Sequence, residues 1–276
     1  MLIFPSTLQN KNEIMEYIGY LAAVGIGISL GLIGGGGSIL TVPVLVYLFK
    51  IEPLMATSYS LFIVGITSLL GAGPYFKNNL IDFKTALFFG LPSILTVFFT
   101  RQYLIDHIPN ILFHFGEVEI SKNMGIMLLF AVLMLFASYR MIKSSPEDKI
   151  QKQGNQKLLP LILQGAGVGL ISGLVGAGGG FLIIPALIIF NQMDMKSAVG
   201  TSLLIIAANS LFGFIGKLEI AQVNWEFLLT IAGIAIIGIL IGTRISQNID
   251  GKKLKPAFGW FVLIMGLVVI IQELSK

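Results

Sequence analysis

A glycine-rich stretch that interrupts a long apolar segment occurs twice, and it limits the folds open to this chain. Residues 31–43 read GLIGGGGSILTVP, and residues 173–185, which lie 142 positions later, read GLVGAGGGFLIIP. Seven of the thirteen paired residues are identical. Because consecutive glycines weaken a helix and leave backbone N–H groups accessible, we expect each copy to break a helix.

The composition indicates that these breaks lie in an integral membrane protein. Of the 276 residues, 55% are hydrophobic and 12% are charged, and the mean hydropathy is +0.88. Soluble domains carry about 25% charged residues. The apolar segments are long enough for helices, which need roughly 20 residues to cross the membrane core, and the alternating strands of a membrane barrel are absent. The sequence therefore predicts an all-α, polytopic membrane protein.

Two of the apolar segments are too short to span a bilayer alone. We place ten runs at about 17–33, 38–49, 54–73, 83–105, 123–142, 158–175, 180–190, 195–216, 225–246 and 254–272. A dozen helical residues rise ~18 Å, about half of the hydrocarbon thickness. The runs 38–49 and 180–190 must therefore pair with the runs before them, which gives eight segments if each broken pair counts as one.

Each broken pair could be one kinked crossing or a re-entrant hairpin, and the basic residues favour the hairpin. Kinked crossings place 10 and 8 of the 18 Lys and Arg residues on the two sides. Hairpins place 12 on one side and leave six on the other: Lys11, Lys50, Arg101, Lys122, Lys217 and Lys276. The second split obeys the positive-inside tendency, with both termini outside. Each half then holds a hairpin and three crossings, so the halves form an inverted repeat.

The repeat continues beyond the glycines and sets the expected domain boundaries. Ala56, Ser60, Leu61, Ser68 and Gly71 match Ala198, Ser202, Leu203, Ser210 and Gly213. We expect an N-terminal tail (1–16), a first membrane repeat (17–142), a polar cytoplasmic linker (143–157) and a second membrane repeat (158–276). Residues 107–121 have no counterpart in the second half, and we expect them to form an exposed loop on the outer side.

The glycine tracts are the predicted substrate-binding site. Half-helices starting near Ser38 and Gly180 would direct unpaired N–H groups and positive dipole ends at a small anion in the middle of the membrane. The alternative is that the glycines only permit close helix packing. We favour a binding site because two such tracts exceed what packing requires. The predicted ligands from the tracts are Gly34, Gly35, Gly36, Gly37, Ser38, Gly176, Gly178, Gly179 and Gly180.

Polar side chains that follow the tracts extend this candidate site. Ser60, Thr201 and Ser202 open the next span in each half, where a hydroxyl can cap the helix or reach an anion. Two further pairs are weaker candidates for substrate contact. Asn209 and Thr67 lie within spans, where they could contact the substrate or form hydrogen bonds between helices. Arg101 and Arg244 lie near the ends of spans, where they could contact the substrate or reach the lipid headgroups.

Several other functions are excluded or disfavoured. The chain has no cysteine, no basic stripe suited to nucleic acid and no P-loop lysine after Gly34–Ser38. The sequence Gly27–Gly31 formally fits a nucleophile elbow, but it lies inside an apolar helix. No Asp or Glu lies mid-span, so no carboxylate relay is visible. We therefore expect neither an enzyme nor a resident cofactor or metal, although a coupling ion, proton or sodium, stays open.

The chain resembles the sulfite exporter TauE/SafE family of membrane transporters. The resemblance covers about Gly19 to Ile271 and rests on the glycine motifs ending at Pro43 and Pro185, the Ala-x-x-x-Ser elements at 56–60 and 198–202, and the Thr-Arg pairs at 100–101 and 243–244. It implies movement of sulfite, sulfonates or related organosulfur anions across the bacterial inner membrane.

These expectations combine into a secondary transporter that holds a small anion between the two hairpins and works by alternating access. An anion channel with a glycine-backbone filter is the alternative. The sequence sets neither the direction of transport nor the oligomeric state, and membrane lipid is the surrounding partner.

Overall fold

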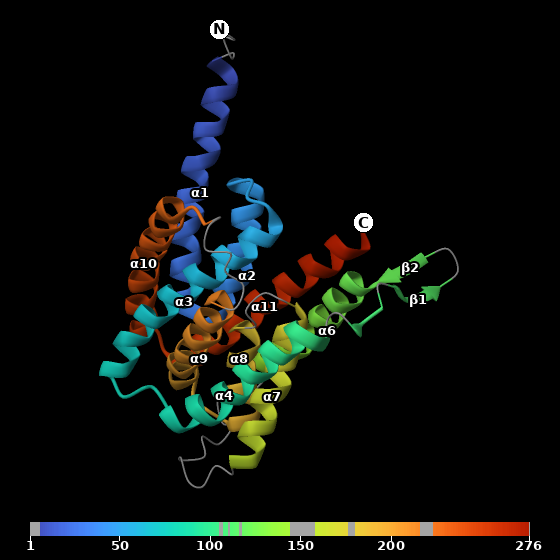
Figure 1. The fold of residues 1–276 in the computed structure, drawn as a ribbon. Helices are drawn as coiled ribbons and strands as arrows, with labels where there is room; N and C mark the ends of the chain where they lie inside the picture. Colours follow the sequence, from blue (N-terminus) through green and yellow to red (C-terminus); the bar gives the residue numbers. More distant parts are fainter. Residues whose placement is uncertain are drawn as a thin grey trace.

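A computed structural model describes residues 6–104, 107–109, 111–115, 118–143, 158–175, 180–215 and 223–275 (Figure 1). The first half holds these elements: α1 (Ser6–Ile33), η1 (Gly35–Gly37), α2 (Ser38–Pro43), η2 (Val44–Leu48), α3 (Pro53–Lys77), α4 (Phe83–Phe99), η3 (Thr100–Leu104), β1 (Ile111–Phe115), β2 (Val118–Ser121) and α6 (Lys122–Lys143). The second holds α7 (Leu158–Val175), α8 (Gly180–Asn191), α9 (Met195–Ile215), α10 (Trp225–Asn248) and α11 (Gly251–Leu274).

Six helices in the described part of the chain are long and apolar enough to cross a membrane. They cover Met55–Lys77, Phe83–Leu104, Met124–Lys143, Met195–Ile215, Trp225–Asn248 and Gly251–Gln272. Three belong to each half. Shorter apolar helices cover Ile18–Ile33, Leu158–Leu174 and Leu182–Asn191. The prediction of a polytopic helical membrane protein is therefore confirmed.

The insertion at 107–121 corrects the prediction of an exposed loop. Residues Ile111–Phe115 and Val118–Ser121 form an antiparallel hairpin, with Phe113 opposite Ile120 and Phe115 opposite Val118. Figure 1 shows it projecting from the start of α6, away from the helices. The prediction of a loop relied on the polar turn and overlooked the β-branched and aromatic residues on either side of it, which favour strands. Of the expected linker at 143–157, Lys143 is the last residue of α6, and the rest lies outside the described residues.

The helices pack as pairs that join the two halves. α1 lies along α10 and α4 along α7, while α3 packs on α9 and α6 on α11. A side chain at Gly65 would meet Leu211, and one at Gly200 would meet Tyr75, so α3 and α9 run in opposite directions. Gly259 and Gly266 approach Ile142 and Met134 in the same way, so α6 and α11 are also antiparallel.

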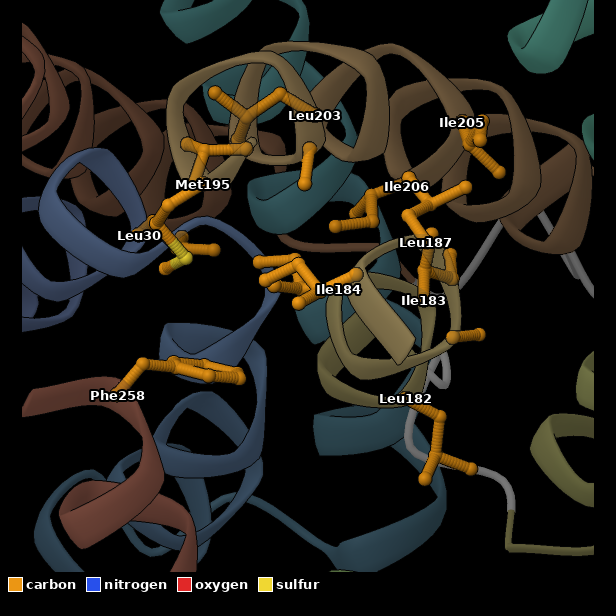
Figure 2. Packing of buried hydrophobic residues seen from close by; sticks show 14 of the residues in the cluster. Leu30, Leu182, Ile183, Ile184, Leu187, Met195, Leu203, Ile205, Ile206 and Phe258 are labelled. Atoms are coloured by element: carbon orange, nitrogen blue, oxygen red, sulfur yellow. The ribbon is translucent and has the colours of Figure 1, made fainter. Parts of the chain in front are cut away.

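The main apolar core surrounds α8. Figure 2 shows Ile183, Ile184 and Leu187 of α8 beneath Leu203 and Ile206 of α9. Leu30 of α1 and Phe258 of α11 extend the same buried cluster. Elements from both halves thus meet around one short helix.

Candidate functional site at the meeting of two glycine tracts

The first glycine tract interrupts the helix, as the sequence predicted. α1 ends at Ile33, and Gly34 adopts φ +71°, a left-handed conformation that favours glycine. The Gly34 N–H still donates to the Leu30 carbonyl oxygen at 2.7 Å. A 3₁₀ turn over Gly35–Gly37 follows, and α2 begins at Ser38. Gly34, Gly35 and Gly37 are buried.

The chain then turns back along α1. The Phe49 ring lies against Tyr20, with ring centroids 5.7 Å apart, and it occupies the space that a side chain at Gly19 would need. Residues that precede the break by about fifteen positions thus contact residues that follow it by the same number. The segments before and after Gly34 form a helical hairpin whose tip is the glycine tract.

The second tract is described only at its end. α7 ends at Val175 and α8 begins at Gly180, the predicted start of the second half-helix. The predicted ligands Gly176, Gly178 and Gly179 lie outside the described residues. Gly180 itself is buried.

The two tracts meet in the interior. A Cβ built at Gly180 would lie 3.4 Å from Gly35 Cα and 2.9 Å from Ile206 of α9. One built at Gly34 would lie 2.6 Å from Ile184 Cδ1 and 3.1 Å from Ser202 Oγ. The structure therefore brings together Gly34, Gly35, Gly180 and Ser202 from the predicted set, and Ile184 and Ile206 pack against them (Figure 2).

The serine and threonine side chains do not cap their own helices. α3 begins at Pro53 and α9 at Met195, so Ser60, Thr201 and Ser202 lie about two turns inside. All three are buried. Ser202 Oγ donates to the Val199 carbonyl oxygen at 2.8 Å, as serine commonly does within a helix.

Thr201 instead bonds to the start of α4. Its hydroxyl accepts the Asp82 backbone N–H at 3.0 Å, and the Asp82 carboxylate caps α4 by accepting the Thr85 N–H at 3.1 Å. A matching arrangement starts α10. Tyr59 Oη accepts the Asn224 N–H at 2.7 Å, and Asn224 Oδ1 accepts the Phe227 N–H at 3.1 Å.

The remaining candidates are spread over the bundle. Thr67 Oγ1 donates to the Ile63 carbonyl oxygen of its own helix at 2.6 Å. Asn209 Nδ2 donates to Ser93 Oγ at 3.0 Å and so joins α9 to α4, while Asn209 Oδ1 is buried without a partner among the described residues. Arg244 is exposed on α10. The side chains of Arg101 and Ser38 and the exposure of Gly36 lie outside what the structure describes.

Two polar residues that the sequence reading missed lie beside the first tip. Tyr75 Oη and Ser246 Oγ reach the carbonyl groups at the end of α1. They are 171 positions apart and belong to no motif, so no pattern in the sequence links them. Among the described residues there is no group of three or more His, Asp or Glu side chains that could hold a metal ion.

A comparison with known protein families matches nearly the whole chain. The family model described as "Sulfite exporter TauE/SafE" matches residues 19–269, nearly the whole chain. The chain belongs to the sulfite exporter TauE/SafE family. This is a family of membrane transporters, and the resemblance drawn from the glycine motifs is thereby confirmed.

Curated relatives cover the chain almost end to end. A "Probable membrane transporter protein" of Xylella fastidiosa is 28% identical over 89% of this chain and 91% of its own. "Probable membrane transporter protein MJ0441" of Methanocaldococcus jannaschii is 29% identical over 89% of this chain and 92% of its own. "Probable membrane transporter protein YunE" of Bacillus subtilis is 27% identical over 87% and 89%. No solved structure matches the chain.

Proposed function

We propose that this protein is a secondary transporter that carries a small anion, sulfite or an organosulfonate, across the bacterial inner membrane by alternating access. The anion binds where the Gly34–Ser38 and Gly176–Gly180 tracts converge. The observation that carries the proposal is the contact between Gly180 and Gly35, which places two helix breaks from opposite halves of the chain at one buried point.

Helix directions support an inverted repeat. α3 and α9 hold equivalent positions in the two halves, and so do α6 and α11, yet each pair runs antiparallel. Equivalent helices that point in opposite directions are what halves inserted in opposite senses produce. Both hairpins would then enter from opposite sides and end near the middle of the membrane.

The pattern of packing supports the same symmetry. Gly31 of α1 meets Thr243 of α10, and Gly173 of α7 meets Thr100 at the start of η3, directly after α4. The glycine motifs are offset by 142 positions and the Thr-Arg pairs by 143, so each of these contacts is the repeat counterpart of the other. Each hairpin therefore packs against a helix of the opposite half, so motion of one half against the other changes the surroundings of both tips.

The electrostatics of the tips suit an anion. α8 begins at Gly180 with no side chain on its first residue, so a ligand could approach its backbone closely. The first N–H groups of a helix have no partner within it, and the aligned peptide dipoles favour negative charge at that end. Inside lipid, an anion satisfies N–H groups that water cannot reach.

The test is flux of sulfite into proteoliposomes that contain the purified protein. Gly34→Ala should abolish saturable uptake, because alanine would be strained at φ +71° and its Cβ would crowd Ile184 and Ser202. Gly25→Ala is the matched control on the same helix, since its Cβ meets nothing within 4 Å. Uptake by Gly34→Ala equal to that of Gly25→Ala would reject the site. Single-channel currents would reject the carrier mechanism.

A further inference from the structure

Hydroxyl groups from two helices bind the end of α1 next to the glycine tip. Tyr75 Oη of α3 donates to Ser246 Oγ of α10 at 2.9 Å and lies 3.4 Å from the Gly31 carbonyl oxygen. Ser246 Oγ donates to the Leu32 carbonyl oxygen at 3.2 Å. A chain of hydrogen bonds thus runs from α3 through α10 to α1.

The bonds answer a need created by the helix break. Because α1 stops at Ile33, the carbonyl groups of its last turn lose the regular sequence of N–H donors that a continuing helix would supply. Tyr75 and Ser246 have relative exposures of 0% and 1%, so water does not replace them. Leaving these carbonyl groups unpaired in a buried site is unfavourable.

This network joins the two halves of the chain at the first hairpin. α1 and α3 belong to the first half, and α10 belongs to the second. With the repeat offsets, the counterpart of Tyr75 is Lys217 and that of Ser246 is Tyr103. Neither residue is conserved in type between the halves, so the second hairpin cannot be held by the same pair of hydroxyls.

The position of the network relates it to access from one end. Tyr75 lies near the end of α3 at Lys77, and Ser246 lies near the end of α10 at Asn248. Gly31 and Leu32 directly precede the break at Gly34. Tyr75 packs on Gly200, whereas the Gly35–Gly180 contact packs on Ile206, more than one turn further along α9. The network therefore lies nearer than that contact to the end of the bundle that carries Lys77.

We propose that Tyr75 and Ser246 are positioning residues that hold the tip of the first hairpin against α10, and that the site opens toward the Lys77 end only when their hydrogen bonds break. The inference rests on the proposed function, because alternating access is what requires the site to open at one end at a time.

Cysteine accessibility tests the proposal directly, because the chain has no native cysteine. Ser202→Cys places a thiol in the proposed site, since Ser202 Oγ lies 3.1 Å from a Cβ built at Gly34. A membrane-impermeant thiol reagent is applied to intact cells and to inside-out vesicles. Cysteines at the exposed positions Lys77 and Glu226 identify the two sides.

Tyr75→Phe and Ser246→Ala, each combined with Ser202→Cys, should raise labelling from the Lys77 side about fivefold, because each removes the Tyr75–Ser246 hydrogen bond and one bond to the end of α1. The double variant should match the single ones, since one network is broken once. Tyr59→Phe is the matched control. It removes a buried tyrosine hydroxyl at the other end of α3, which accepts the Asn224 N–H, and should leave labelling from the Lys77 side unchanged.

Unchanged labelling in both variants, or an equal increase from both sides, would overturn the proposal. Thermal unfolding of each variant in detergent accompanies the labelling, and Tyr75→Phe keeps the buried ring. Failure of the proposed function has a different result. In that case sulfite neither enters proteoliposomes nor protects the cysteine at position 202 from the thiol reagent, while Tyr75→Phe still raises labelling from the Lys77 side only. The positioning role then holds, and the proposed substrate site is wrong.

Discussion

Gly31 and Gly242 bring α1 and α10 into backbone contact, because a Cβ built at Gly242 would lie 3.0 Å from Gly31 Cα. Without a hydrophobic drive between helices in lipid, such close packing supplies much of the attraction. The contact fixes the first hairpin to the second half. Gly31 and Gly242 therefore serve helix packing, which was the alternative role considered for the glycine tracts. The first tract itself lies at the tip of the first hairpin.

Gly31→Val should destabilise the protein by about 1–3 kcal/mol, the usual effect of forcing extra atoms into a packed interface. The new Cβ would lie 2.6 Å from the Thr243 backbone nitrogen. Gly25→Val on the same helix controls for helix propensity, since space at Gly25 is open. Thermal unfolding in detergent is the measurement, and equal midpoints for the two variants would contradict the packing.

Asp82→Ala should lower stability by about 1 kcal/mol, because the carboxylate caps α4 through the Thr85 N–H at 3.1 Å. Asn224→Ala should have a similar effect, since Asn224 caps α10 at the equivalent position. Thermal unfolding of the two variants tests whether the caps at the starts of α4 and α10 are equivalent. A loss for only one of them would show that the symmetry does not extend to these caps.

Thr201→Val should weaken the same region while leaving the Asp82 cap in place. It removes the hydroxyl that accepts the Asp82 N–H at 3.0 Å and retains nearly the same volume. Removing one partner of a buried hydrogen bond costs about 1–3 kcal/mol. Sulfite uptake at a saturating sulfite concentration should stay close to that of the wild type despite this loss of stability. A complete loss of uptake in a normally folded variant would instead place Thr201 in contact with the substrate.

The hairpin itself can be tested by cross-linking. Cysteines at Tyr20 and Phe49 should be joined by a short bifunctional thiol reagent in membranes, because the two rings are in contact. Cysteines at Phe49 and Phe76 provide a pair at distant positions of the first half as a comparison. Efficient linkage only in the comparison pair would contradict a chain that turns back at Gly34.

The sequence predicted the helices and the breaks well because both leave local signals. Runs of apolar residues predicted α7 at its observed bounds, and the glycines located the starts of α2 and α8 at Ser38 and Gly180. The sequence alone did not show whether Pro43 lies in the first turn of a helix or at a kink. In the structure Pro43 is the last residue of α2, and a π-helix over Val44–Leu48 follows it. The wider π-helical turn accommodates a residue without an N–H.

What the sequence missed depends on contacts between distant residues. Thr201 was weighed as a cap of its own helix or an anion ligand, yet its hydroxyl binds Asp82, 119 positions away. The bond between Tyr75 and Ser246 spans 171 positions. Neither pair forms a motif or follows a helical period, so only the packing of the helices reveals them.

The most direct test of the account is equilibrium binding of sulfite to the purified protein, with Gly180→Ala compared with Gly167→Ala. A Cβ at Gly180 meets Ile206 and the Gly35 backbone, whereas one at Gly167 meets nothing within 4 Å. The account predicts saturable binding by the wild type and by Gly167→Ala, and its loss in a folded Gly180→Ala variant. Equal binding by both variants would contradict an anion site where the two glycine tracts meet.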